Sequence, residues 1–193
     1  SHLLCSQTNS RWLVRAVNLK NLPCDIRFNC IQQDRDGFLW IGTQDGLNRY
    51  DGFQFKVYTN DRKDSTSLSD NLIRTMALDK KGNLWIGTNR GLNLLTLFKD
   101  KSSGKSTESF YTYLSDSSDK STISDDEIRS LYFDKEGLLW IGTTSGLNKA
   151  IINYEEINKG NYKSALKVTR YIYDKNNSNS LGHNFISSIT ENA

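Results

Sequence analysis

The sequence predicts an all-β fold built from β-propeller blades, and three observations support this prediction. The motif Leu-Trp-Ile-Gly-Thr occurs at residues 39–43, 84–88 and 139–143, and each copy is followed by Gly-Leu-Asn. The copies recur after 45 and then 55 residues. Each is preceded by the turn signal Asp-x-x-Gly and by a short apolar segment. Self-similarity of this length is typical of stacked or radial repeat architectures.

Each repeat has room for four short strands. The apolar segments at 26–33, 72–78 and 128–133 read as first strands, because they are short and end at a turn signal. In Asp-x-x-Gly, the Asp side chain caps a tight reversal and the Gly supplies its positive φ. Leu-Trp-Ile-Gly-Thr is then the second strand, and Gly-Leu-Asn opens the third, as in 92–98. Alternating aromatic residues mark the fourth strands at 53–58, 110–113 and 168–173. Four antiparallel strands in about 45 residues are the content of a propeller blade.

Polar connectors separate the repeats and set the domain boundaries. Related sequences occur at 65–71, 120–126 and 178–184, and the third copy is followed by a segment that restates residues 71–76. The chain is therefore expected to contain three complete blades and the first strand of a fourth, in an incomplete ring. The expected divisions are 1–10 (tag or signal-peptide remnant), 11–21 (outer closing strand), 22–64 (blade 1), 65–119 (blade 2), 120–177 (blade 3) and 178–193 (truncated start of blade 4).

A β-sandwich of seven or more strands is the alternative fold. It accounts for the strands but not for a motif that occurs three times with its flanking turns. The propeller is therefore the preferred interpretation.

Composition excludes several functional classes. The chain has 193 residues, 36% of them hydrophobic, and a formal net charge of +3 without a basic block. No apolar run approaches the ~18 residues that span a bilayer, so no membrane contact is expected from this fragment. The dispersed charge argues against nucleic acid as a partner.

The three cysteines form neither a disulfide framework nor a metal pattern. Cys24 and Cys30 lie about 20 Å apart if their segment is extended, which is too far for a disulfide. Both are interpreted as buried free thiols. Cys5 follows two leucines and fits either the end of a secretory signal or a tag remnant.

Most repeated residues are expected to be architectural. The tryptophans pack between blades, the motif glycines permit close approach of the next blade, and the aspartates cap turns. A calcium site at Asp34 and Asp36 is disfavoured, because the second carboxylate is replaced by lysine in the next repeat. These structural residues are Trp40, Trp85, Trp140, Gly42, Gly87, Gly142, Asp34, Asp79 and Asp134.

Ligand-binding residues are instead expected where the repeats differ, on loops held by a rigid ring. Loops that enter the first strands and turns between second and third strands meet at one mouth of the channel. Amides, carboxylates and Arg forks suit the hydroxyls of a sugar, and Arg suits a sulfated or uronic sugar especially. The alternative is that these residues are merely a solvated rim. The candidates are Gln44, Asp45, Asn71, Arg74, Asn89, Arg90, Asp126, Arg129, His183 and Asn184.

Catalysis has little support in the sequence. The two histidines, His2 and His183, are not accompanied by a nucleophile set or by a cluster with metal-ligand spacing. No catalytic residue, cofactor or metal is assigned. Carboxylates that meet in the channel, as in propeller glycosidases, stay open as an alternative.

The full motif, Asp-x-x-Gly-x-Leu-Trp-Ile-Gly-Thr-x-x-Gly-Leu-Asn, resembles the two-component regulator propeller repeat over residues 22–193. The resemblance implies the periplasmic sensor region of an inner-membrane hybrid histidine kinase, which responds to oligosaccharides released from glycans. It also implies seven blades, a β-sandwich, a membrane helix and a kinase in the parent. This chain lacks every kinase motif, so kinase activity would belong to the parent.

The preferred function is therefore a non-catalytic, ligand-sensing propeller fragment that relays a signal to a histidine kinase. The alternatives are a fragment of a propeller lyase or glycosidase and a protein-interaction propeller without a small ligand. The expected partners are an oligosaccharide and a second copy of the chain. In that dimer, residues 184–190 of one copy would pair with residues 11–17 of the other.

Overall fold

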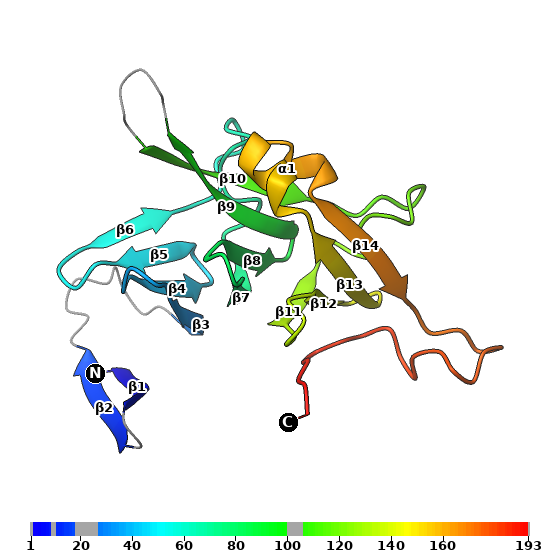
Figure 1. Cartoon of the computed structure of the whole chain (residues 1–193), viewed down its shortest axis with the longest axis horizontal. Helices are drawn as coiled ribbons and strands as arrows, with labels where there is room; N and C mark the ends of the chain where they lie inside the picture. The colour runs from blue at the N-terminus through cyan, green and yellow to red at the C-terminus, as the bar shows by residue number, and fades with distance from the viewer. Residues whose placement is uncertain (1, 9–10, 18–26, 100–105, 193) are drawn as a thin grey trace.

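The computed structural model describes residues 2–8, 11–17, 27–99 and 106–192, and the side chains within 27–96 and 108–192. Within these residues, three four-stranded antiparallel sheets follow one another along the chain (Figure 1). Each is a propeller blade, which confirms the predicted fold class, and no sheet within the described residues closes the ring.

The strands of blade 1 are β3 (Phe28–Gln33), β4 (Leu39–Thr43), β5 (Leu47–Tyr50) and β6 (Phe55–Tyr58). Those of blade 2 are β7 (Ile73–Leu78), β8 (Leu84–Thr88), β9 (Gly91–Lys99) and β10 (Ser106–Tyr113). Those of blade 3 are β11 (Ile128–Phe133), β12 (Leu139–Thr143), β13 (Leu147–Ile152) and β14 (Leu166–Tyr171).

An N-terminal hairpin precedes the blades. It consists of β1 (His2–Thr8) and β2 (Arg11–Val17), paired antiparallel with Ser6 opposite Leu13. Residues 11–17 thus form a strand, and so do residues 2–8, which the sequence had suggested to be a remnant. Residues 18–21 lie outside the described part of the chain. The role of residues 11–21 as the outer strand of a closed ring stays a prediction.

The Asp-x-x-Gly turns have the geometry that their sequence predicts. Gly37, Gly82 and Gly137 adopt φ values of 90°, 91° and 84°. In blade 1, the Oδ1 atom of Asp34 accepts hydrogen bonds from the backbone N–H groups of Asp36 and Phe38, both at 3.0 Å. The Oδ2 atom accepts the indole N–H of Trp40 at 2.8 Å. The Asp therefore caps the turn and orients the motif tryptophan at the same time.

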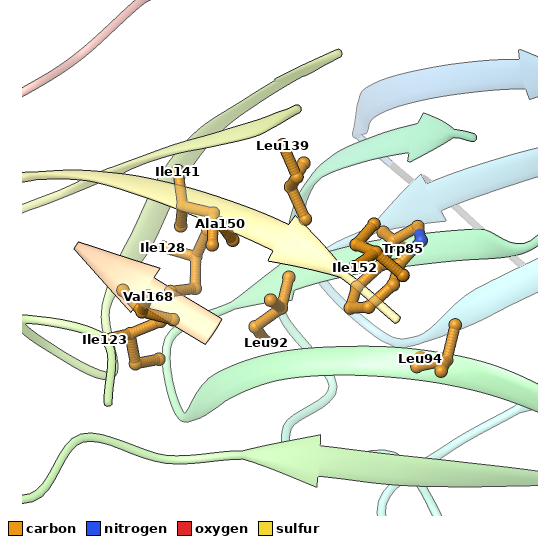
Figure 2. Close-up of a cluster of buried hydrophobic side chains, with 10 residues drawn as sticks. All are labelled: Trp85, Leu92, Leu94, Ile123, Ile128, Leu139, Ile141, Ala150, Ile152 and Val168. Carbon is orange, nitrogen blue, oxygen red and sulfur yellow. The ribbon is translucent and has the colours of Figure 1, made fainter. Parts of the chain in front are cut away.

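The hydrophobic core lies between the blades. The inner strands β3, β7 and β11 run side by side, and the other strands extend outward from them (Figure 1). Trp85 of blade 2 is fully buried against apolar side chains of blade 3, among them Leu139 and Ile152 (Figure 2). Trp40 of blade 1 packs in the same way against Met76 and Phe110 of blade 2. Blade 2 thus contributes to both cores, one shared with blade 1 and one with blade 3, and the motif tryptophans Trp40 and Trp85 lie at these interfaces as the sequence predicts.

The motif glycines set the distance between blades. A Cβ atom at Gly42 would lie 2.6 Å from Ile73 Cγ2, and one at Gly87 would lie 2.6 Å from Ile128 Cγ2. At Gly142 the corresponding neighbour is Ile186, whose Cγ2 would be 2.7 Å away. Because only glycine leaves this space, it permits the first strand of the following blade to pack closely.

Ile186 therefore occupies the place of a first-strand residue of a fourth blade. Its backbone N–H donates to the carbonyl of Thr143 at 3.0 Å. Residues 184–190, expected as a strand, are nevertheless not assigned as one. A strand requires a ladder partner, and within the described residues no second strand of a fourth blade is present to provide it.

One insertion was not anticipated from the sequence. Between β13 and β14 the chain forms the helix α1 (Tyr154–Lys159) and the 3-10 turn η1 (Tyr162–Ser164). The signals that form α1 are local: Asn153 accepts the N–H groups of Glu155 and Glu156, and Gly160 ends the helix with φ of 81°. The Tyr162 ring lies 5.2 Å from that of Tyr111 in blade 2. The insertion thus packs on the preceding blade.

We expect Gly87→Ala to lower the free energy of unfolding by about 1–3 kcal/mol, because the added methyl group overlaps Ile128 and forces the blades apart. Gly182→Ala is the matched control, since its Cβ would meet nothing within 4 Å. Denaturant unfolding of both variants measures the difference. Equal stabilities of the two variants would contradict this account of blade spacing.

Candidate functional site

The blades have two ends that differ in chemistry. At the connector end lie the loops 59–72 and 114–127, the turns between second and third strands, and the starts of the inner strands. At the turn end lie the Asp-x-x-Gly turns and the α1 insertion. The sequence placed all candidate binding residues at the connector end.

Three of these candidates and two neighbouring residues form a cluster where blades 2 and 3 meet. The Nη2 atom of Arg74 lies 3.3 Å from Glu127 Oε1, and the Nη1 atom of Arg129 donates to the same oxygen at 2.8 Å. Arg74 Nε donates to the side-chain oxygen of Asn89. The guanidinium of Arg129 lies 5.0 Å from the centre of the Phe185 ring. We call Arg74, Asn89, Glu127, Arg129 and Phe185 the junction cluster.

The junction cluster is half-buried and joins three successive repeats. The side chains of Arg74, Glu127 and Arg129 are 28%, 34% and 26% exposed. Arg74 comes from β7, Arg129 from β11 and Phe185 from the segment after blade 3. A group bound here would therefore contact two blades and the start of a further repeat.

Glu127 and Phe185 were missed from the sequence, although a signal was present. Both stand at the repeat position that Leu72 occupies in blade 2. A carboxylate replaces an apolar residue in one copy and an aromatic ring replaces it in another. The principle that function lies where repeats differ would have selected this position.

Two further contacts border the junction cluster. Arg90 Nε lies 3.8 Å from Asp70 Oδ2. Asp125 Oδ2 accepts the hydroxyls of Thr144 and Ser145, both at 2.6 Å. Burial raises the pKa of Asp125, but the hydrogen bonds from Ser145 and Thr144 outweigh it and lower the pKa. Asp125 therefore stays ionised at neutral pH.

Three other candidates perform the same structural task in each connector. The side-chain oxygens of Asn71, Asp126 and Asn184 each accept a backbone N–H from eleven residues upstream, at 2.6 Å in all three cases. The structure does not bring these oxygens into the junction cluster. A ligand-binding role for them stays a prediction.

The last three candidates also lie apart from the junction cluster. His183 Nδ1 accepts the N–H of Phe185 at 3.0 Å, the role that Asp70 plays for Leu72. Gln44 and Asp45 are exposed in the turn of blade 1. The ligand-binding role of these residues also stays a prediction.

A second candidate site lies at the turn end, where the sequence had placed none. A hollow of about 810 Å³ opens between blades 1 and 2, and α1 supplies part of its wall. Its floor includes Phe38 and Trp40, with the Arg49 guanidinium 4.7 Å from the centre of the Phe38 ring. Arg49 in turn forms an ion pair with Glu108 of blade 2.

Glu108 is the electrostatic centre of this second site. It accepts hydrogen bonds from Arg49, Lys56 and the hydroxyl of Tyr58, the last at 2.5 Å, and its side chain is 11% exposed. Burial raises the pKa of Glu108, but its hydrogen bonds with Lys56 and Tyr58 and the charge of Arg49 lower it overall. Burial and the Glu108 carboxylate raise the pKa of Tyr58. Glu108 and its three donors thus form a network of hydrogen bonds and ion pairs that links blades 1 and 2.

The described residues show little else of chemical interest. Among them, no group of three or more His, Cys, Asp or Glu side chains is arranged to hold a metal ion. Cys30 is a half-buried free thiol, and burial raises its pKa to about 12, so it stays protonated. Cys24 and the side chain of Cys5 lie outside the described residues. No helix in the described part of the chain has the length and apolar character needed to cross a membrane.

Three segments of the chain, residues 21–45, 67–90 and 122–145, match the family model described as two component regulator propeller. A 39-residue segment is 59% identical to Histidine kinase P4 of Formosa agariphila, and covers 20% of this chain and 3% of that protein. The matched part is thus a small fraction of the curated relative.

Two solved structures share the fold. The extracellular domain of a putative hybrid two component system from B. thetaiotaomicron superposes with a TM-score of 0.65 at 22% identity, over 89% of this chain and 21% of that one. PorZ, a surface component of the type-IX secretion system of Porphyromonas gingivalis, gives a TM-score of 0.60 at 15% identity, over 96% of this chain and 27% of that one. The chain therefore spans only 21% and 27% of the length of these two structures.

We expect Glu108→Gln to lower the free energy of unfolding by about 1–3 kcal/mol at neutral pH, because the variant loses the charge that the three donors share. Since the folded-state pKa of Glu108 lies below the ordinary value of 4.5, its contribution is complete above about pH 4.5 and is lost as the pH falls through the lowered pKa. Glu136→Gln, at an exposed position, is the control. Unfolding curves between pH 3 and pH 7 test this, and a pH-independent difference would contradict it.

Proposed function

We propose that this chain, whose three repeats belong to the two-component regulator propeller family, is the ligand-sensing part of a hybrid two-component signalling protein. The repeat matches and the identity with a histidine kinase over 39 residues support this role. We further propose that the sensor lies in the periplasm, that its ligand is an oligosaccharide, and that a histidine kinase elsewhere in the parent receives the signal. The chain itself is proposed to be non-catalytic.

The observation that carries the proposal is the junction cluster. Arg74 and Arg129 share one oxygen of Glu127, so several of their N–H donors are left for a ligand. Phe185 is 44% exposed and offers an apolar ring beside these donors. A sugar presents hydroxyl groups and apolar C–H faces, and this combination of charged donors and an aromatic ring suits both.

The position of the junction cluster also suggests how a signal would pass. Its residues come from two blades and from the start of a further repeat. A ligand that binds one arrangement of these units better than another shifts the population toward that arrangement. We propose that this shift is transmitted along the propeller to the parent kinase.

A protein-interaction role is the second candidate, and the hollow at the turn end favours it. The hollow combines aromatic residues with charged residues of both signs, and α1 forms part of its wall. We also propose that the chain self-associates, because Ile31 on the first blade and Tyr171 on the last are 49% and 38% exposed.

We expect an oligosaccharide that binds this chain to lose at least about tenfold in affinity on Arg129→Ala, since the variant loses a charged donor and the partner of Phe185. Arg62→Ala, at an exposed connector position, is expected to leave the affinity unchanged. Isothermal titration calorimetry against an oligosaccharide library identifies the ligand and compares the variants. Equal losses in both variants, or the absence of binding to both the chain and its parent sensor region, would contradict the proposal.

A further inference from the structure

The three connectors contain the same folded loop. We call residues 61–67, 116–122 and 174–180 loops 1, 2 and 3. In loop 1, the carbonyl of Asp61 accepts the N–H of Asp64 at 3.0 Å and the hydroxyl of Ser67 at 3.0 Å. The carbonyl of Asp64 accepts the N–H and the hydroxyl of Ser67 at 3.1 and 2.8 Å. Loops 2 and 3 repeat the bonds to the first carbonyl with their own residues. The first and fourth carbonyls therefore occupy equivalent places in each loop.

In loop 2 these carbonyls accept hydrogen bonds from the positively charged guanidinium group of Arg170. The Nη2 atom of Arg170, from β14, donates to the carbonyls of Asp116 and Asp119 at 3.0 and 2.8 Å. The same nitrogen lies 2.6 Å from the Thr122 hydroxyl, and Arg170 Nε donates to the Thr122 carbonyl at 2.7 Å. Three carbonyls and a hydroxyl thus converge on one guanidinium, and two Asp residues of the loop add negative charge.

Loop 1 has the same acceptors but no guanidinium. In blade 3, Arg170 stands opposite Asn148, and in blade 2 the residue opposite the equivalent Asn93 is Thr112. The Thr112 hydroxyl is bonded to Asn93 at 3.1 Å. β10 nevertheless lies against loop 1, since Phe110 N–H donates to the Thr66 carbonyl at 2.7 Å. Among the described residues, none from outside loop 1 donates to the carbonyls of Asp61 and Asp64.

We propose that loop 1 binds a small, hard metal cation at the place that the Arg170 guanidinium occupies in loop 2. The ligands would be the carbonyl oxygens of Asp61 and Asp64 and the hydroxyl oxygen of Ser67, which correspond to the three oxygens around Arg170 Nη2. The Ser67 carbonyl, which corresponds to the partner of Arg170 Nε, would lie beside them. Oxygen ligands of this kind are those that Ca²⁺ takes in proteins. Asp61 and Asp64 supply two carboxylates, as Asp116 and Asp119 do around Arg170. Arg62 and Lys63 belong to the same loop, but both are exposed.

The hydrogen bonds within loops 1 and 2 differ in length, as expected if the loop can adjust when a cation binds to its carbonyls. In loop 2, the carbonyl of Asp116 lies 3.3 Å from the N–H nitrogen of Asp119 and 3.4 Å from the Thr122 hydroxyl. The corresponding distances in loop 1 are both 3.0 Å. The carbonyl that contacts the guanidinium is thus less tightly held by the loop's own donors.

Cation binding in loop 1 would therefore be coupled to the junction cluster. Loop 1 leads directly into Asp70 and β7, which carries Arg74 of the junction cluster. A cation in loop 1 would order the connector that positions these residues.

The test measures the number of cations bound per chain by the wild type and by two variants. Ca²⁺ and K⁺ are titrated separately into the wild type, Thr112→Arg and Arg170→Ala, with calorimetry and thermal unfolding as readouts. Thr112→Arg places a guanidinium over loop 1 and is expected to bind one cation fewer than the wild type. Arg170→Ala vacates loop 2 and is expected to bind one more, with its loss of thermal stability partly reversed by the cation.

Two control variants separate cation binding by the loop carbonyls from effects of the substitutions on the rest of the protein. Thr112→Val leaves loop 1 unfilled and is expected to keep the wild-type number of cations, and Arg170→Lys is expected to gain none. If Thr112→Arg does not fold, Thr112→Lys provides the same test. Binding in loop 3 would raise every count equally and leave the differences intact. The same count in all versions, or no binding of either cation by any of them, would overturn the proposal.

Discussion

The close approach of consecutive blades is the constraint on which the rest of this structure depends. A motif glycine in each blade leaves space for an isoleucine of the next repeat, and in blades 1 and 2 the neighbouring tryptophan is buried by the next blade. An Asp from the preceding turn orients each tryptophan through its indole N–H. The motif therefore encodes the interface between blades more than the blade itself. This explains why the same residues recur while the rest of each repeat varies.

The chain's polar chemistry is concentrated at the same interfaces. Glu108 joins blades 1 and 2, Glu127 lies between two arginines of blades 2 and 3, and Arg170 holds the connector between those blades. None of these residues is part of the repeated motif. The invariant apolar contacts thus set the geometry, and the variable charged residues at each junction give it individual chemistry. A propeller built in this way can change the chemistry of its junctions without changing its architecture.

The repeat explains how much of the structure could be predicted. Strands, turns and inter-blade tryptophans follow from residues that recur, so β11 and the three Leu-Trp-Ile-Gly-Thr strands were placed without error. Glu108 and the hollow at the turn end were missed, because their partners lie in another blade and far away in the sequence. Glu127 was missed although its position differs between the repeats, because only the structure shows that Arg74 of blade 2 reaches it. The α1 insertion was missed because its sequence, residues 153–165, is not repeated elsewhere in the chain. Residues 184–190 form no strand because a ladder needs a partner as well as a suitable sequence.

The most direct test of the central claim compares Trp85→Ala with Trp140→Ala. Both substitutions remove the same motif residue and the same indole hydrogen bond, but Trp85 is fully buried by the next blade, whereas Trp140 is only partly covered. Equilibrium unfolding is expected to show a loss of about 3–5 kcal/mol for Trp85→Ala and a clearly smaller loss for Trp140→Ala. Equal losses would contradict the claim, because they would place the stabilising contacts of this tryptophan within its own blade.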